Sequence, residues 1–273
     1  MRKSPVQCIY CGDPGKLTRE HIFGKRIAAQ VPNKAKRSLH ITSHKAYDPT
    51  SKTMTHLMGK GRLHREGDLY TQQLKLVCKT CNETWMGDIQ KAAIPHVSKL
   101  INGPWPQLTN EIATIIATWA TMATISYQFA DMKTNASSNE ERKYFHEHQL
   151  PPSNWIVCAA RFNKSMGRIW HRGAQASLPE QIGLSNNPNM QTTTFCIGGA
   201  LLHTLSAPPG ILPNPGEYAA RLGMILLWPL GGSNFRSGGT FTDMGARRIA
   251  NVFWTDYLGV AESLVDPSIL LGP

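Results

Sequence analysis

Two cysteine pairs constrain the fold of this chain more than any other feature of its sequence. Each pair has the spacing Cys-x-x-Cys, and the pairs are Cys8 with Cys11 and Cys78 with Cys81. Four thiolates on two tight turns form the closed tetrahedral site that is typical of structural zinc. Free or redox-active cysteines are the alternative, which this spacing disfavours in a reducing compartment. A zinc ion would join the two ends of the long segment between them.

The positive charge of the chain is concentrated near its N-terminus. The 273 residues carry a formal net charge of +11. Residues 1–100 contain 18 Lys and Arg against 7 Asp and Glu, whereas residues 101–273 contain 11 of each. A local basic excess suits a polyanion binder, because neutralised phosphates release condensed counterions. Solubility or contact with an acidic protein would also account for it, so charge alone favours nucleic acid only modestly.

The apolar segments are too short for a membrane protein. No apolar stretch follows the first residues as it would in a secretory signal. The most apolar run, residues 222–232, is shorter than a membrane span and contains proline. We therefore expect a cytoplasmic protein with no membrane partner.

Residues 101–108, INGPWPQL, have the composition of a linker and coincide with the end of the basic excess. They divide the chain into a basic domain at 1–100 and an accessory domain at 101–273. Hydrophobic periodicity predicts helices at 82–101, with a break before Pro95, and at 109–132, 139–150 and 216–228. It predicts strands at 69–78, 154–162, 167–178, 192–207 and 247–254. Residues 31–68 form either a long excursion or two short hairpins. The fold class is α+β, with an antiparallel sheet in the accessory domain.

An acidic residue and a histidine, Glu20 and His21, lie between the cysteine pairs in the segment LTREHIFGKR. Such a dipeptide is a weak signal by itself, because most surface histidines have no special role. Its position makes it a candidate for phosphodiester hydrolysis, which needs a base for water and a divalent cation at the phosphate. His21 titrates near neutrality, and Glu20 and Asn82 offer oxygen ligands.

The segments CIYCG, LTREHIFGKR and QLKLVCKTCNETWM together resemble the HNH endonucleases of the ββα-metal (His-Me finger) class. They are most similar to a bacterial and phage subgroup with a CxxC pair on each side of the finger. The resemblance covers about residues 6–90. It implies a zinc-stapled ββα-metal finger followed by the mixed helix and sheet domain.

The resemblance also implies a role for each site residue. Glu20 and Asn82 would bind the catalytic Mg²⁺ or Mn²⁺, and His21 would activate water. The residue that orients this histidine, often asparagine in the family, is Gln73 here, and a glutamine carbonyl can also accept the imidazole N–H. Zinc would be held by the four paired cysteines.

Basic residues after the Glu-His pair are candidates for phosphate contacts. A solvated charged turn is the alternative. The local charge excess favours phosphate contact for Lys25 and Arg26, and more weakly for three later residues, Lys34, Lys36 and Arg37.

We therefore expect a metal-dependent endonuclease acting on nucleic acid, DNA more than RNA, in phage defence or on mobile elements. The accessory domain would serve dimerisation, targeting or regulation, and a homodimer would suit cutting of both strands. A non-catalytic zinc-binding module that grips nucleic acid is the main alternative, and a protein–protein adaptor is the third.

Overall fold

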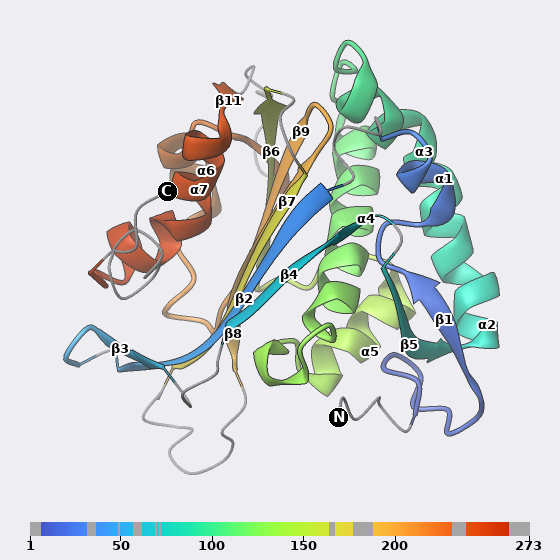
Figure 1. The fold of residues 1–273 in the computed structure, drawn as a ribbon, viewed down its shortest axis with the longest axis horizontal. Helices are drawn as coiled ribbons and strands as arrows, with labels where there is room; N and C mark the ends of the chain where they lie inside the picture. Colours follow the sequence, from blue (N-terminus) through green and yellow to red (C-terminus); the bar gives the residue numbers. More distant parts are fainter. Residues whose placement is uncertain are drawn as a thin grey trace.

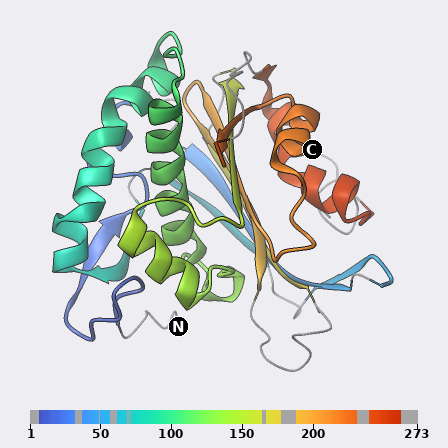
Figure 2. The same cartoon turned by 180° about the vertical axis from the view of Figure 1, so that it is seen from behind.

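The structure is a computed structural model in which a large β-sheet separates two helical layers (Figures 1 and 2). It describes residues 7–31, 37–48, 50–56, 62–68, 70, 72–163, 167–176, 188–230 and 239–261. One face of the sheet is covered by the long helix α4, beyond which α3 and a small two-stranded sheet lie. The opposite face is covered by α6 and α7 (Figure 1). The prediction of a mixed α+β fold is confirmed.

The elements follow one another as β1–α1–β2–β3–β4–β5–α2–α3–α4–η2–α5–β6–β7–β8–β9–α6–β10–β11–α7–η4. The helices are α1 (Lys25–Ala28), α2 (Lys79–Glu83), α3 (Trp85–Asn102), α4 (Asn110–Gln128), η2 (Met132–Thr134), α5 (Asn139–His148), α6 (Pro215–Leu222), α7 (Asp243–Val252) and η4 (Phe253–Tyr257). The strands are β1 (Leu17–His21), β2 (Arg37–Asp48), β3 (Thr53–His56), β4 (Arg62–Asp68), β5 (Gln73–Cys78), β6 (Trp155–Phe162), β7 (Arg168–Ala176), β8 (Met190–Ile197), β9 (Ala200–Ser206), β10 (Ile225–Trp228) and β11 (Thr240–Phe241).

The large sheet is mixed, so the prediction of an antiparallel sheet was wrong in part. Its order is β10-β6-β9-β8-β7-β2-β3, with β11 beside β6 and β4 beside β2. The pairs β2–β7 and β6–β11 are parallel, and the other pairs are antiparallel. Parallel strands need a long crossover connection. The connection from β2 to β7 runs through α2, α3, α4 and α5, which no local sequence pattern could reveal.

The central strands are buried on both faces. In β6, Trp155 and Val157 point into the core on the α4 side, while Ile156 and Cys158 point into the core on the α6 and α7 side. This explains why the segment WIVCAA is a nearly continuous apolar run and does not alternate. Cys158 and Cys196 are both fully buried in the core on the α6 and α7 side, where they pack as small hydrophobic residues.

Segments on both sides of the linker at 101–108 share this architecture. Strands β2, β3 and β4 come from the first hundred residues, yet they extend the sheet made by the later strands. The core on the α4 side also contains residues from both parts, for example Phe23, Trp119 and Phe195. Phe23 and Phe195 meet edge to face, with ring centroids 5.2 Å apart. The proposed boundary therefore separates two stretches of sequence that are packed together.

Helix α3 continues through Pro95, where we expected a break. Proline has no N–H to donate and usually disrupts a helix interior. Here Pro95 lies on the exposed side, and so does Lys91, whose carbonyl would have accepted that missing bond. Water can reach this carbonyl, while Ala93 and Val97 hold the opposite side of the helix in the core.

Two of the predicted elements each divide at a glycine. The strand expected at 192–207 is the hairpin of β8 and β9, which turns at Gly198 with φ of +55°. A Cβ atom on Gly198 would lie 2.6 Å from Cγ2 of Ile101, so the turn also needs glycine for space. The helix expected at 216–228 ends as α6 before Gly223, which has φ of +66°, and the chain continues as β10.

The strand expected at 247–254 was wrong, because these residues form most of α7 and the start of η4. Thr242 caps the helix by accepting a hydrogen bond from the Gly245 N–H at 3.4 Å. Ala246, Ile249 and Ala250 then face the core with helical spacing. The β-branched and aromatic residues of this segment suggested a strand, but burial of one helical face outweighed their propensity.

Two histidines are buried in the middle of the sheet with polar partners. Nε2 of His171 donates to the Thr134 carbonyl at 2.9 Å, and Nδ1 lies 2.8 Å from the Thr193 hydroxyl. His203 lies 2.8 Å from both the Thr194 and the Tyr218 hydroxyls. Burial, with a smaller effect of Arg172, lowers the pKa of His171 to about 4 and that of His203 to about 3.

These histidines should make the fold sensitive to acid. The unfolded chain takes up protons on both histidines below about pH 6.5, whereas the folded chain does not until near pH 4, so stability is lost as the pH falls through this window. At pH 5 each histidine should cost about 2 kcal/mol relative to pH 7. Urea unfolding at pH 7 and pH 5 measures the loss. His203→Gln should remove about half of it, and His148→Gln, on the exposed end of α5, should change it little. An equal pH dependence in wild type and His203→Gln would refute this explanation.

Candidate functional site

The four paired cysteines meet at the base of the small sheet. All four Sγ atoms lie within 4.8 Å of one another, and those of Cys11 and Cys78 are 3.6 Å apart. Ligands of a tetrahedral zinc ion at 2.3 Å would be about 3.8 Å apart. The cluster therefore has the donor atoms and the size for a structural metal ion, as the spacing predicts.

Local backbone structure brings the two cysteine turns together. The Ile9 N–H donates to the Leu76 carbonyl at 3.0 Å, which ties the first turn to β5. Cys78 is the last residue of β5 and caps α2, with its sulfur accepting from the Cys81 N–H at 3.5 Å. Trp85 packs edge to face on Tyr10, with ring centroids 4.9 Å apart, in agreement with its prediction as core packing.

Glu20 and His21 end the first strand of a two-stranded antiparallel sheet. β1 pairs with β5 so that His21 lies opposite Gln73, and α2 follows β5 directly. Nε2 of His21 and Nε2 of Gln73 are 2.6 Å apart. The residue expected to orient the imidazole is therefore in contact with it. Partial burial and the positive charge of Lys25 hold the pKa of His21 below its usual value, which favours the neutral ring.

Glu20 is a buried carboxylate without a cationic partner among the described residues. Its exposed fraction is 7%. Burial raises the pKa of Glu20 to about 7, although hydrogen bonds from Gln90 and Asn82 lower it in part. An unpaired buried carboxylate is costly unless a positive charge compensates it. Among the described residues, hydrogen bonds alone offset the burial of this carboxylate.

Asn82 reaches the same place from α2. Its amide nitrogen donates to the Thr18 hydroxyl at 3.0 Å, and that hydroxyl donates to the Val77 carbonyl at 3.0 Å. The amide nitrogen is thereby engaged, and the side-chain oxygen of Asn82 is left as a ligand. A carboxylate and an amide oxygen are donors that Mg²⁺ and Mn²⁺ accept. Glu83, which follows Asn82, is exposed and lies 3.8 Å from Lys79.

The basic residues that were expected to contact phosphates are described only in part. Lys25 and Arg26 begin α1, four and five residues after His21, and both side chains are exposed. Arg37 is the first residue of β2, and its side chain is not among those described. Lys34 and Lys36 lie outside the described residues.

The sequence did not point to Gln90, which contacts Glu20 directly. Nε2 of Gln90 donates to Oε1 of Glu20 at 2.8 Å. Gln90 lies on α3, where the buried residues Met86, Ala93 and Val97 lie four residues before it and three and seven residues after it. A polar residue within an apolar stripe was the signal that could have identified it.

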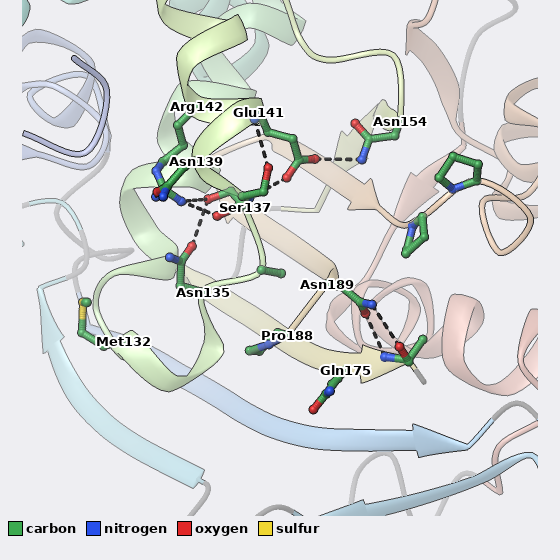
Figure 3. A pocket seen from close by; sticks show the side chains of 15 residues that line it. Met132, Asn135, Ser137, Asn139, Glu141, Arg142, Asn154, Gln175, Pro188 and Asn189 are labelled. Carbon is green, nitrogen blue, oxygen red and sulfur yellow. Dashed lines mark hydrogen bonds between the residues drawn. The ribbon is translucent and has the colours of Figure 1, made fainter. Parts of the chain in front are cut away.

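A separate hollow of about 620 Å³ lies beside α5 (Figure 3). Arg142 and Glu141 contribute to its wall, together with polar residues such as Asn135 and Asn154. Arg142 donates to the Ile9 carbonyl at 2.9 Å and also to Ser137 and Asn139. None of the site residues predicted from the sequence lines this hollow.

Comparisons of the chain with protein-family profiles, curated proteins and solved structures give no match. Within the described residues, every helix is too short or too polar to cross a bilayer.

Proposed function

We propose that the protein is a metal-dependent endonuclease of the HNH type, which hydrolyses phosphodiester bonds in DNA. The observation that carries the proposal is the grouping of Glu20, His21 and Asn82 at the junction of two antiparallel strands and the following helix, with Glu20 buried and without a cationic partner among the described residues. The four-cysteine cluster supports it, because it fixes β5 and α2 on which Gln73 and Asn82 lie. The basic N-terminal third suits a polyanionic substrate.

Each residue has one chemical task in this proposal. Glu20 and Asn82 hold a divalent cation, which supplies positive charge at the scissile phosphate and the leaving oxygen. His21, neutral because its pKa is lowered, takes a proton from the attacking water. Lys25 and Arg26, exposed beside the site, contact the phosphates of the substrate.

The contact between Gln73 and His21 decides which ring nitrogen acts as the base. Gln73 occupies Nε2, so Nδ1 is the nitrogen left for water. Nδ1 has a free lone pair only when the proton is on Nε2, and Nε2–H needs an acceptor. The Gln73 amide meets this need with its carbonyl oxygen, which a half-turn of the amide brings to the ring.

This assignment predicts opposite behaviour for two substitutions of Gln73. Gln73→Glu, which offers only acceptor oxygens, should retain cleavage because it keeps the proton on Nε2. Gln73→Ala should slow cleavage at least about tenfold, because the ring loses its orientation and its preferred tautomer. Single-turnover cleavage rates at saturating Mg²⁺ measure both, with Gln107→Ala as an exposed glutamine control. Faster cleavage by Gln73→Ala than by Gln73→Glu would reverse the assignment.

Plasmid cleavage tests the function itself. Zinc-loaded protein should nick or linearise supercoiled DNA when Mg²⁺ or Mn²⁺ is added, and should not when both are omitted or EDTA is present. Salt-dependent DNA binding without any cleavage would instead indicate a non-catalytic nucleic-acid binder. If the protein neither binds nor cleaves DNA, a structural zinc adaptor is the remaining candidate.

A further inference from the structure

We infer that Gln90 is a positioning residue for the cation site, and that Gly24, whose backbone conformation already favours glycine, also leaves room for the Gln90 amide. This inference rests on the proposed function. It concerns two residues from different elements, one on α3 and one in the turn after β1. Neither residue belongs to the set to which the sequence analysis assigns the chemistry.

The hydrogen bond from Gln90 engages one of the two carboxylate oxygens of Glu20. The distance from Nε2 of Gln90 to Oε1 of Glu20 is 2.8 Å. The carboxylate is buried and has no cationic partner among the described residues, so this amide and that of Asn82 are what hold it. The bond from Gln90 to Oε1 sets the orientation in which the carboxylate would face a cation.

The other end of the Gln90 amide lies against Gly24. A Cβ atom on Gly24 would stand 1.9 Å from Oε1 of Gln90 and 2.6 Å from its Cδ, far inside van der Waals contact. Gly24 also has φ of +73°, and its N–H donates to the His21 carbonyl at 3.3 Å in the turn that leaves β1. The turn carrying the backbone of His21 therefore packs directly on the amide that holds Glu20.

These contacts make Gln90 a link between three parts of the site. It comes from α3, bonds Glu20 on β1, and touches the turn that leads to Lys25 and Arg26 on α1. Residues that orient metal ligands in this way typically change metal affinity by 10- to 100-fold when they are replaced. We expect the same range for Gln90.

Binding of Mn²⁺ to zinc-loaded protein, measured without DNA by the electron paramagnetic resonance signal of free Mn²⁺, tests the inference apart from catalysis. Gln90→Met keeps the volume of the side chain and loses the N–H donor, so the dissociation constant for Mn²⁺ should rise about 10- to 100-fold. The zinc content and melting temperature should stay near the wild-type values. Gln107→Ala, an exposed glutamine outside the site, should bind Mn²⁺ as wild type does.

Gly24→Ala tests the same link from the opposite side. The added methyl group should push the Gln90 amide away from Glu20 and weaken Mn²⁺ binding to a similar extent. Gly210→Ala is the matched control, because Gly210 has a comparable φ of +85° with nothing within 4 Å of its Cβ position. It also places alanine at a positive φ but without the contact, and its Mn²⁺ affinity should be unchanged.

The results separate this inference from the proposed function. If the wild-type protein cuts DNA and binds Mn²⁺, and Gln90→Met and Gly24→Ala bind Mn²⁺ equally well, the role of Gln90 is overturned while the proposed function stands. Wild type that neither binds Mn²⁺ nor cuts DNA would overturn the cation site itself, and the inference with it. Weak binding by Gly210→Ala equal to that of Gly24→Ala would attribute the effect to backbone strain and overturn the assigned contact with Gly24.

Discussion

His21→Ala is expected to cut DNA at least about a hundredfold more slowly than the wild-type protein at saturating Mg²⁺. General-base catalysis by a positioned side chain contributes on the order of 10² to 10⁴ in rate. The substitution removes the imidazole but leaves Glu20, Asn82 and the cysteine cluster in place. Affinity for DNA and the zinc content should therefore be retained.

Single-turnover cleavage and a zinc assay on the same preparations measure this expectation. His148→Ala is the control, because His148 is an exposed histidine at the end of α5 and should cut normally. Metal-dependent cleavage by His21→Ala at the wild-type rate would exclude His21 as the base. That result would not bear on the zinc cluster or the fold.

Cys78→Ala should lose the zinc ion and unfold at a much lower temperature. Structural zinc sites contribute on the order of 10–16 kcal/mol of binding free energy in small zinc domains, which is comparable to the whole stability of a typical domain of about 5–15 kcal/mol. Cys78 also ends β5 and caps α2, so its loss should disturb both elements that carry site residues.

Zinc stoichiometry by elemental analysis and thermal unfolding followed by circular dichroism test this prediction. Cys158→Ala is the matched control: Cys158 is buried in β6, away from the cluster, and this variant should keep its zinc. Full zinc occupancy and unchanged melting of Cys78→Ala would show that the cluster is not a zinc site. Cleavage should be lost together with zinc, because Asn82 follows the second cysteine turn directly.

Most residues of the candidate site could be identified from the sequence. The Cys-x-x-Cys spacing and the adjacent Glu20 and His21 are local features, and the chemistry of their side chains is independent of the fold. The resemblance placed the orienting residue at Gln73, and the register of β1 against β5 brings Gln73 opposite His21. The polar Gln90 within the apolar stripe of α3 was the only local sign of its role, because its hydrogen bond to Glu20 on β1 depends on the tertiary structure.

The larger architecture was less accessible from sequence. Helices α4 and α5 were predicted from hydrophobic periodicity, and in the structure Thr109 caps α4 with its hydroxyl at 3.2 Å from the Ile112 N–H. Helix α7 was predicted as a strand because its residue types favour one, whereas contact with β8 and β9 requires a helical face.

The sequence by itself determined the elements of chemistry: four thiol ligands, a Glu-His pair, an asparagine after the second turn, and positive charge near them. Only the tertiary structure decided that strands from the N-terminal third join the large sheet, that Glu20 is buried with no cationic partner among the described residues, and that Gln90, packed against Gly24, donates a hydrogen bond to it. The physical reason is that residue type and short spacing act within one turn or one strand, whereas burial and strand partners depend on segments far apart in the chain.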